Sequence, residues 1–223
     1  MVNAKLVIKR RQVFEMPGLG RLAAPLAMSL AALLLALVAS HYTGLSLAEL
    51  SDDAALSAKR GWLIGALSTL GSVLLAMAAG VSLLAVALRK HYNAGPRRAS
   101  TSFWLACCSL LLLADDAFLL HEGLFLLVLG IPEFFTQAFI GGVVMAVLML
   151  FRRSIAGSFI FALPAVICWV ISVLSDSLLD DRQLAALVIE DGFKLLGICL
   201  WLQFSFDMAR RSISQVIDSQ GQT

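Results

Sequence analysis

The chain has 223 residues, of which 60% are hydrophobic and only 14% are charged. Soluble globular domains carry about 25% charged residues, so this composition excludes an ordinary water-soluble enzyme. The formal net charge is only +2, so the positions of the charges are more informative than their sum. The apolar residues stand in long blocks, each close to the ~20 residues that cross a bilayer as a helix. The sequence therefore predicts an all-α, polytopic membrane protein.

Six transmembrane helices are expected after a basic segment at residues 1–21. The apolar blocks lie at residues 22–40, 61–88, 103–120, 134–151, 158–174 and 184–208. The apolar core of a secretory signal peptide has about 7–15 residues. The first block is longer than that, so we expect it to remain in the mature protein as a helix. Together residues 22–208 form the predicted transmembrane domain, and residues 209–223 form a tail. Residues 123–133 (GLFLLVLGIPE) are too apolar for a free loop and too few to span, which predicts an interfacial or re-entrant segment on the outer side.

The basic residues predict how the chain is oriented. With an even number of spans both termini lie on one side, and placing them in the cytoplasm puts 13 of the 17 basic residues there. Positive charge is enriched in the cytoplasmic loops of membrane proteins, which favours this N-in, C-in topology. The basic stretches are thereby explained as topology determinants next to membrane lipids, and we expect no nucleic-acid partner.

Ionisable residues inside two of the apolar blocks are the best indication of a function. Such residues are costly near the middle of a membrane, so they should face the interior of the bundle or water. The predicted topology puts both groups at a similar depth near the extracytoplasmic face. The outer end of the third block, with the two residues just after it, contributes the first four, and the sixth block contributes the last three: Asp115, Asp116, His121, Glu122, Glu190, Asp191 and Lys194.

The charge of these residues points to a ligand or to shared protons. With every acid ionised and the histidine neutral, five carboxylates face one lysine, which leaves four negative charges. Such an excess at membrane depth requires bound cations, protons or water. Asp115 and Glu122 share a helix face but stand about 10 Å apart along the axis, too far to chelate one ion. A divalent metal site, with zinc as one candidate, would therefore be built between helices from Asp116, His121, Glu122 and Glu190.

A purely structural interpretation stands beside this one. The acids near the outer helix ends could reach interfacial water, and Lys194 could pair with Glu190 or Asp191 to clamp two helices together. Gly197 lies on the same helix face as Lys194 and would let a neighbouring helix approach closely.

The acidic doublet followed by HE, and the later acidic doublet followed by Lys and Gly, resemble a pattern of uncharacterised small polytopic bacterial membrane proteins. That resemblance implies a location in the bacterial inner membrane. More distantly, acids and a histidine at helix ends are similar to the alkaline ceramidase-like membrane hydrolases, which hold zinc through three histidines. This chain departs from that pattern, because His41 and His91 fall at opposite faces of the membrane and only His121 is near the acids.

Three functions are compatible with the sequence. The first is a metal-dependent hydrolase of a lipid or amphiphile, in which the seven ionisable residues form the catalytic site and the acids or His121 act as general acid and base. Against it, the chain has no GxSxG or HExxH motif. The second is a proton- or cation-coupled transporter. The third is an accessory subunit that binds a membrane-protein partner or a second copy of itself.

Overall fold

The computed structural model describes residues 22–44, 66–92, 96–118, 120, 129–178 and 184–220, and all the regular structure in these ranges is helical. The described elements begin with α1 (Ala23–Thr43), α3 (Ala66–His91), α4 (Pro96–Phe118), α5 (Glu133–Leu150) and the single turn α6 (Arg152–Ile155). The chain continues through a 3₁₀ turn, η3 (Ala156–Ser158), into α7 (Phe159–Leu178) and α8 (Leu184–Gln220).

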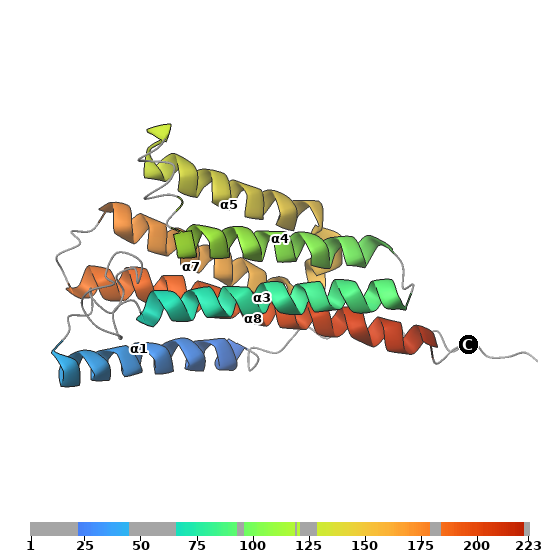
Figure 1. The fold of residues 1–223 in the computed structure, drawn as a ribbon, viewed down its shortest axis with the longest axis horizontal. Coiled ribbons are helices and arrows are strands. Elements are labelled where there is room, and N and C mark those ends of the chain that lie inside the picture. Colours follow the sequence, from blue (N-terminus) through green and yellow to red (C-terminus); the bar gives the residue numbers. More distant parts are fainter. Residues whose placement is uncertain are drawn as a thin grey trace, which may run out of the picture.

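The long helices lie roughly side by side, and successive ones run in opposite directions (Figure 1). The long helix α8 is the centre of the bundle, because it packs against α7, α3, α4 and α1. The next neighbours are α3 against α4 and α4 against α5. The start of α1 and the end of α8 lie at the same end of the bundle (Figure 1). We call that end the basic end, and the opposite end, where α4 finishes and α5 begins, the acidic end.

Local sequence explains where several of these helices stop. Gly44 ends α1 in the left-handed conformation (φ 72°), and its N–H donates to the carbonyl of Ser40. Glycine adopts this conformation without the steric cost that a Cβ brings. Pro132 stands immediately before α5, where a missing N–H costs no helical hydrogen bond. Between α5 and α7 the chain turns at Phe151, whose N–H donates to the carbonyl of Val147.

Within the part of the chain that the structure describes, five helices are long and apolar enough to cross a membrane, by length and composition. They are Pro25–Tyr42, Ala66–His91, Ser100–Phe118, Glu133–Leu150 and Arg152–Ser175. Each corresponds to one of the first five predicted blocks. Their outer faces expose large apolar side chains, including Leu35, Phe139 and Leu150. Such a surface suits a lipid environment, in which an apolar exterior costs nothing.

The sixth predicted block, residues 184–208, lies inside α8, which does not meet the same criterion. Its apolar stretch is interrupted by Lys194, Gln203 and Asp207. The middle of α8 is nevertheless deeply buried, and Trp201 and Phe204 have no exposed surface. The number of spans therefore stays a prediction at six. The helix also continues through residues 209–220, so most of the predicted tail is an extension of the bundle.

The segment that was expected to be interfacial or re-entrant is described only at its end. Residues 129–132 lead into α5, and Gly130 has a left-handed backbone (φ 66°). Residues 123–128 lie outside the described residues, so the prediction for this segment is untested.

Candidate functional site

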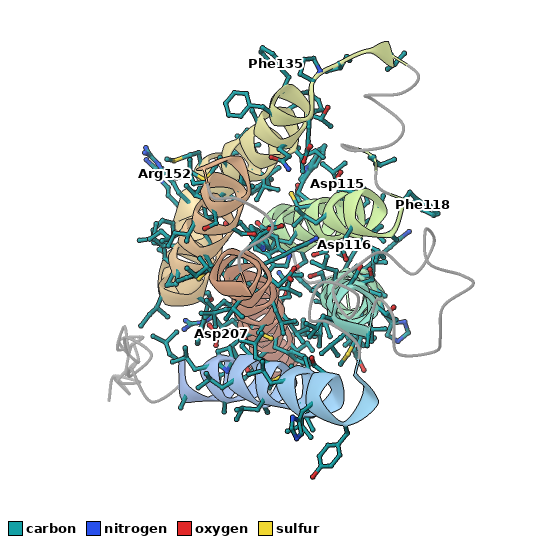
Figure 2. All side chains as sticks on the ribbon, turned by 90° about the vertical axis from the view of Figure 1, so that its left-hand side faces the viewer. Asp115, Asp116, Phe118, Phe135, Arg152 and Asp207 are labelled. Carbon is teal, nitrogen blue, oxygen red and sulfur yellow. The ribbon has the colours of Figure 1, made fainter. Side chains whose placement is uncertain are left out.

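A buried carboxyl group on α4 joins three helices at the acidic end. Asp116 Oδ1 forms an ion pair with Nζ of Lys194 on α8, with 2.8 Å between the two atoms. Asp116 Oδ2 accepts a hydrogen bond from Oγ of Ser72 on α3 at 2.7 Å. Figure 2 shows Asp115 and Asp116 near the centre of the bundle, whereas Phe118 points outward. One carboxylate therefore connects α4 to both α3 and α8.

The two members of this ion pair differ in their exposure. The side chain of Asp116 is only 5% exposed, whereas that of Lys194 is 43% exposed. A buried carboxylate requires a counter-charge and hydrogen-bond donors, and Lys194 and Ser72 supply both. Part of the lysine remains open to its surroundings. Asp116 is thus buried and held in place, whereas Lys194 remains accessible.

The exposed side of this ion pair faces a pocket of about 430 Å³. Residues from four helices, α4, α5, α7 and α8, form most of its wall. The residues with ionisable or amide side chains are Asp115, Asp116, Glu133, Gln137, Glu190 and Lys194. Most of the others are apolar, and they include Leu112, Ile140, Val144, Met145, Val166, Trp169, Val170, Val173, Leu174 and Ile198. We call this cavity the acidic pocket.

The formal charge of the acidic pocket is negative. Four carboxyl groups and one ammonium group line it, which leaves three negative charges when all of them are ionised. One of these carboxyl groups, Glu133, accepts a hydrogen bond from Nε2 of Gln137 at 2.9 Å. Because the surrounding side chains are largely apolar, the charges are screened less than they would be in water. The arrangement can attract a cation and can accept protons.

The acidic pocket reaches the outer surface of the bundle on α5 and α7. Three of its lining residues are large apolar side chains that are at least half exposed: Phe134 at 63%, Val170 at 51% and Leu174 at 50%. The adjacent Phe135 points away from the bundle (Figure 2). These residues belong to helices that are long and apolar enough to span a membrane, so the opening lies on an apolar surface.

The structure brings four of the predicted site residues together. Asp115 and Asp116 on α4 line the same pocket as Glu190 and Lys194 on α8. Asp191 is partly buried beside Glu190 and does not line the pocket. His121 and Glu122 lie outside the described residues. Lys194, for which the sequence also allows a pairing within α8, forms the described 2.8 Å ion pair with Asp116 on α4.

A metal site was also expected among these residues. Within the described ranges, no group of three or more His, Cys, Asp or Glu side chains is gathered closely enough to hold a metal ion. Both oxygens of Asp116 already face protein donors. Since two of the four predicted ligands, His121 and Glu122, are not described, the metal site and the hydrolase stay predictions.

The sequence does not single out Ser72, Glu133 or Gln137, which are polar residues of the site. Ser72 is one of several hydroxyl residues in α3, and nothing in its surroundings in the sequence distinguishes it from the others. Glu133 is the last residue of the predicted connecting segment 123–133, so the block pattern does not group it with Gln137. Their spacing of four residues places them on one helix face, and they do form a hydrogen bond there. That spacing was the signal that could have found them.

A second buried carboxyl group lies near the basic end of α8. Asp207 accepts hydrogen bonds from Ser158 Oγ (2.6 Å) and Arg211 Nε (2.7 Å). It also pairs with Arg210 (3.1 Å). Arg211 in turn donates to the carbonyl of Gly157 at 2.8 Å. These contacts fasten η3 to α8 and are a structural counterpart to the ion pair of Asp116.

Comparison with known proteins places this architecture in a family. The family model described as a domain of unknown function, DUF8692, matches residues 26–208. The chain belongs to the DUF8692 family. The matched region contains every residue that lines the acidic pocket, as well as Asp207. The chain matches none of the curated proteins and none of the solved structures.

Proposed function

We propose that this protein is a multi-pass membrane transporter that binds an organic cation in the acidic pocket and exchanges it for protons. In this proposal α8 is the sixth span and both termini are cytoplasmic. The acidic pocket then faces the extracytoplasmic side of a bacterial inner membrane. The orientation rests on the excess of basic residues in the segments assigned to the cytoplasm.

The observation that carries the proposal is the position of Asp116. It is a buried carboxyl group that lines an open pocket and is at the same time bonded to α3 and α8. Ionisable residues within membrane helices are expensive and are typical of ion and proton pathways. A buried carboxyl at the wall of a negatively charged pocket is suited to exchange a proton for another cation.

The ion pair provides a way to couple the two ligands. A cation that approaches Asp116 competes with Lys194 for the same carboxylate, and a proton on Asp116 removes the charge that holds Lys194. Either event weakens the link between α4 and α8. Two ligands that act on one equilibrium affect each other's binding reciprocally. The proposal therefore requires that cation binding depends on pH and on Asp116.

Proton–cation exchange can be measured in liposomes that contain the purified protein and a trapped pH-sensitive dye. Tetramethylammonium is a suitable probe, because a quaternary cation cannot cross the lipid as a neutral base. Adding it outside should drive protons out and raise the internal pH. Asp116→Asn and Glu190→Gln should each lower the initial rate by about tenfold or more, since each removes a charge from the pocket.

The matched control is Asp181→Asn, the same acid-to-amide change at a residue that the sequence assigns to an outer loop. It should leave the rate unchanged. An internal pH that does not respond to tetramethylammonium would contradict the proposal. So would equal rates in the wild type and in both pocket variants.

A further inference from the structure

The acidic pocket is polar at one end and apolar along the rest of its length. On α5 the polar residues Glu133 and Gln137 come first, and Val144 and Met145 follow two to three turns later. On α8, Glu190 and Lys194 precede Ile198 in the same direction along the bundle. On α4, which runs the opposite way, the order is reversed, and Leu112 precedes Asp115. The charges are therefore confined to the acidic end.

The pocket as a whole is long enough for a head group and an alkyl chain. Glu133 and Met145 are 12 residues apart, which is about 18 Å at 1.5 Å per helical residue. One leaflet of a bilayer has a hydrocarbon thickness of about 15 Å, half of its ~30 Å core. The pocket volume of about 430 Å³ is in the range of small-molecule sites.

The wall of the pocket extends to the outer surface of α5 and α7. Phe134, Val170 and Leu174 line the pocket and are also exposed, so its wall is continuous with the apolar outer surface between α5 and α7. A water-soluble cation needs no such opening. A ligand that is dissolved in the membrane does, because its apolar part must pass between the two helices without entering water.

We infer that the ligand is a single-chain amphiphile with a cationic head group, which enters from the membrane between α5 and α7. The head group lies among Asp115, Glu133 and Glu190, and the chain lies along α5 and α7 towards Met145. This inference rests on the proposed function and adds the chemical class of the substrate. Charge complementarity selects a cationic head group over an anionic or neutral one.

Two adjacent glycines of α5 allow a sharp test. A Cβ at Gly141 and a Cβ at Gly142 would each meet no atom within 4 Å, and both residues are exposed. Only Gly141 lines the acidic pocket. Gly141→Leu should therefore fill the apolar part of the pocket, whereas Gly142→Leu places the same side chain elsewhere on the same helix. Neither substitution should prevent folding.

The probe is a trimethylammonium with a bromine at the end of an eleven-carbon chain, because bromine quenches a tryptophan that it contacts. Trp169 lines the pocket, so quenching in lipid nanodiscs reports where the chain lies. Trp169→Phe should remove most of the quenching. Gly141→Leu should raise the concentration needed for half-maximal quenching by about tenfold or more, and Gly142→Leu should leave it unchanged. Glu190→Gln should raise it by about tenfold.

Two further probes with the same bromoalkyl chain, an alcohol and a sulfonate, separate the possible failures. Equal quenching by all three would mean that the head group is not recognised, which overturns both this inference and the proposed function. A second result would overturn the inference alone. In that case Gly141→Leu would bind the bromoalkyl cation like the wild type, while tetramethylammonium exchange still required Glu190.

Discussion

Asp116 and Asp207 are two buried carboxylates whose negative charge is compensated in different ways. Both are buried carboxyl groups, and each accepts a hydrogen bond from a serine on another part of the chain. Asp207 is held by two arginines on its own helix, so its charge is neutralised locally. Asp116 pairs with a lysine from a different helix, and both side chains line the acidic pocket. The Asp116 pair is therefore the one that a ligand in the pocket can reach.

Removing both members of the Asp116–Lys194 pair should cost less stability than the sum of the losses from removing each one alone. Lys194→Met leaves a buried carboxylate without its counter-charge, and we expect a loss of about 1–3 kcal/mol in the free energy of unfolding. This is below the range for fully buried pairs, because the lysine is partly exposed. Asp116→Ala should also be destabilising, since Ser72 loses its acceptor. Titration with SDS of the purified single and double variants measures these changes.

The double variant decides whether the two side chains interact in the folded protein. It should be more stable than the sum of the two single losses implies, by about 0.5–3 kcal/mol. Arg152→Met, which removes an exposed cation at the other end of the bundle, is the control and should have little effect. Strict additivity of the two single losses would contradict a stabilising ion pair.

At the scale of elements, α8 packs closely against its neighbours α7 and α4. The Gly197 position, expected from the sequence to allow close packing, faces α7. A Cβ there would lie 2.6 Å from Cδ1 and Nε1 of Trp169 and 3.2 Å from the carbonyl oxygen of Ala165. The indole that forms part of the pocket wall thus rests directly against the backbone of α8. A second tie is the hydrogen bond from Trp201 Nε1 to Ser109 Oγ on α4, at 2.9 Å.

We expect Gly197→Ala to destabilise the protein, although alanine is the better helix former. The added methyl group would overlap the rigid indole of Trp169, and such overpacking costs about 1–3 kcal/mol. The same substitution at Gly142, where a Cβ meets open space, should be neutral or stabilise by up to about 1 kcal/mol. Thermal unfolding of both variants in the same detergent compares them.

Trp169→Leu separates this clash from other effects of a methyl group at position 197. In the Trp169→Leu background the cost of Gly197→Ala should be smaller, with some cost remaining because the Ala165 carbonyl is still close. If Gly197→Ala is as harmless as Gly142→Ala, α7 does not approach α8 in the way described here.

At the scale of the whole molecule, the helices were largely predictable and the site only in part. Runs of apolar residues predict the first five long helices closely, because a membrane requires length and hydrophobicity that few other structures share. The contact between Asp116 and Lys194 is predictable from the sequence, because charged residues on two membrane helices must both face away from lipid. The pairing of Asp116 with Ser72 was not, because it depends on how α3 is rotated about its axis. No single sequence encodes that rotation in a recognisable motif.

The orientation of the molecule in the membrane is the prediction on which the direction of exchange depends. Tyr42 lies at the end of α1 and Ile131 just before α5, and both are exposed. Tyr92 directly follows α3 and Ile217 lies in the last turn of α8, and both are exposed. The first two helix ends are at the acidic end of the bundle and the other two at the basic end (Figure 1). Single cysteines at these four positions, in a variant without the four native cysteines, can be labelled in intact cells with a membrane-impermeant maleimide. We expect Tyr42→Cys and Ile131→Cys to react from outside, and Tyr92→Cys and Ile217→Cys to react only after permeabilisation. We expect this labelling pattern because it leaves thirteen of the 17 basic residues in the cytoplasm.

The opposite labelling pattern would place the acidic pocket on the cytoplasmic side and reverse the direction of the proposed exchange. Labelling of one end from both sides would contradict a bundle that spans the membrane.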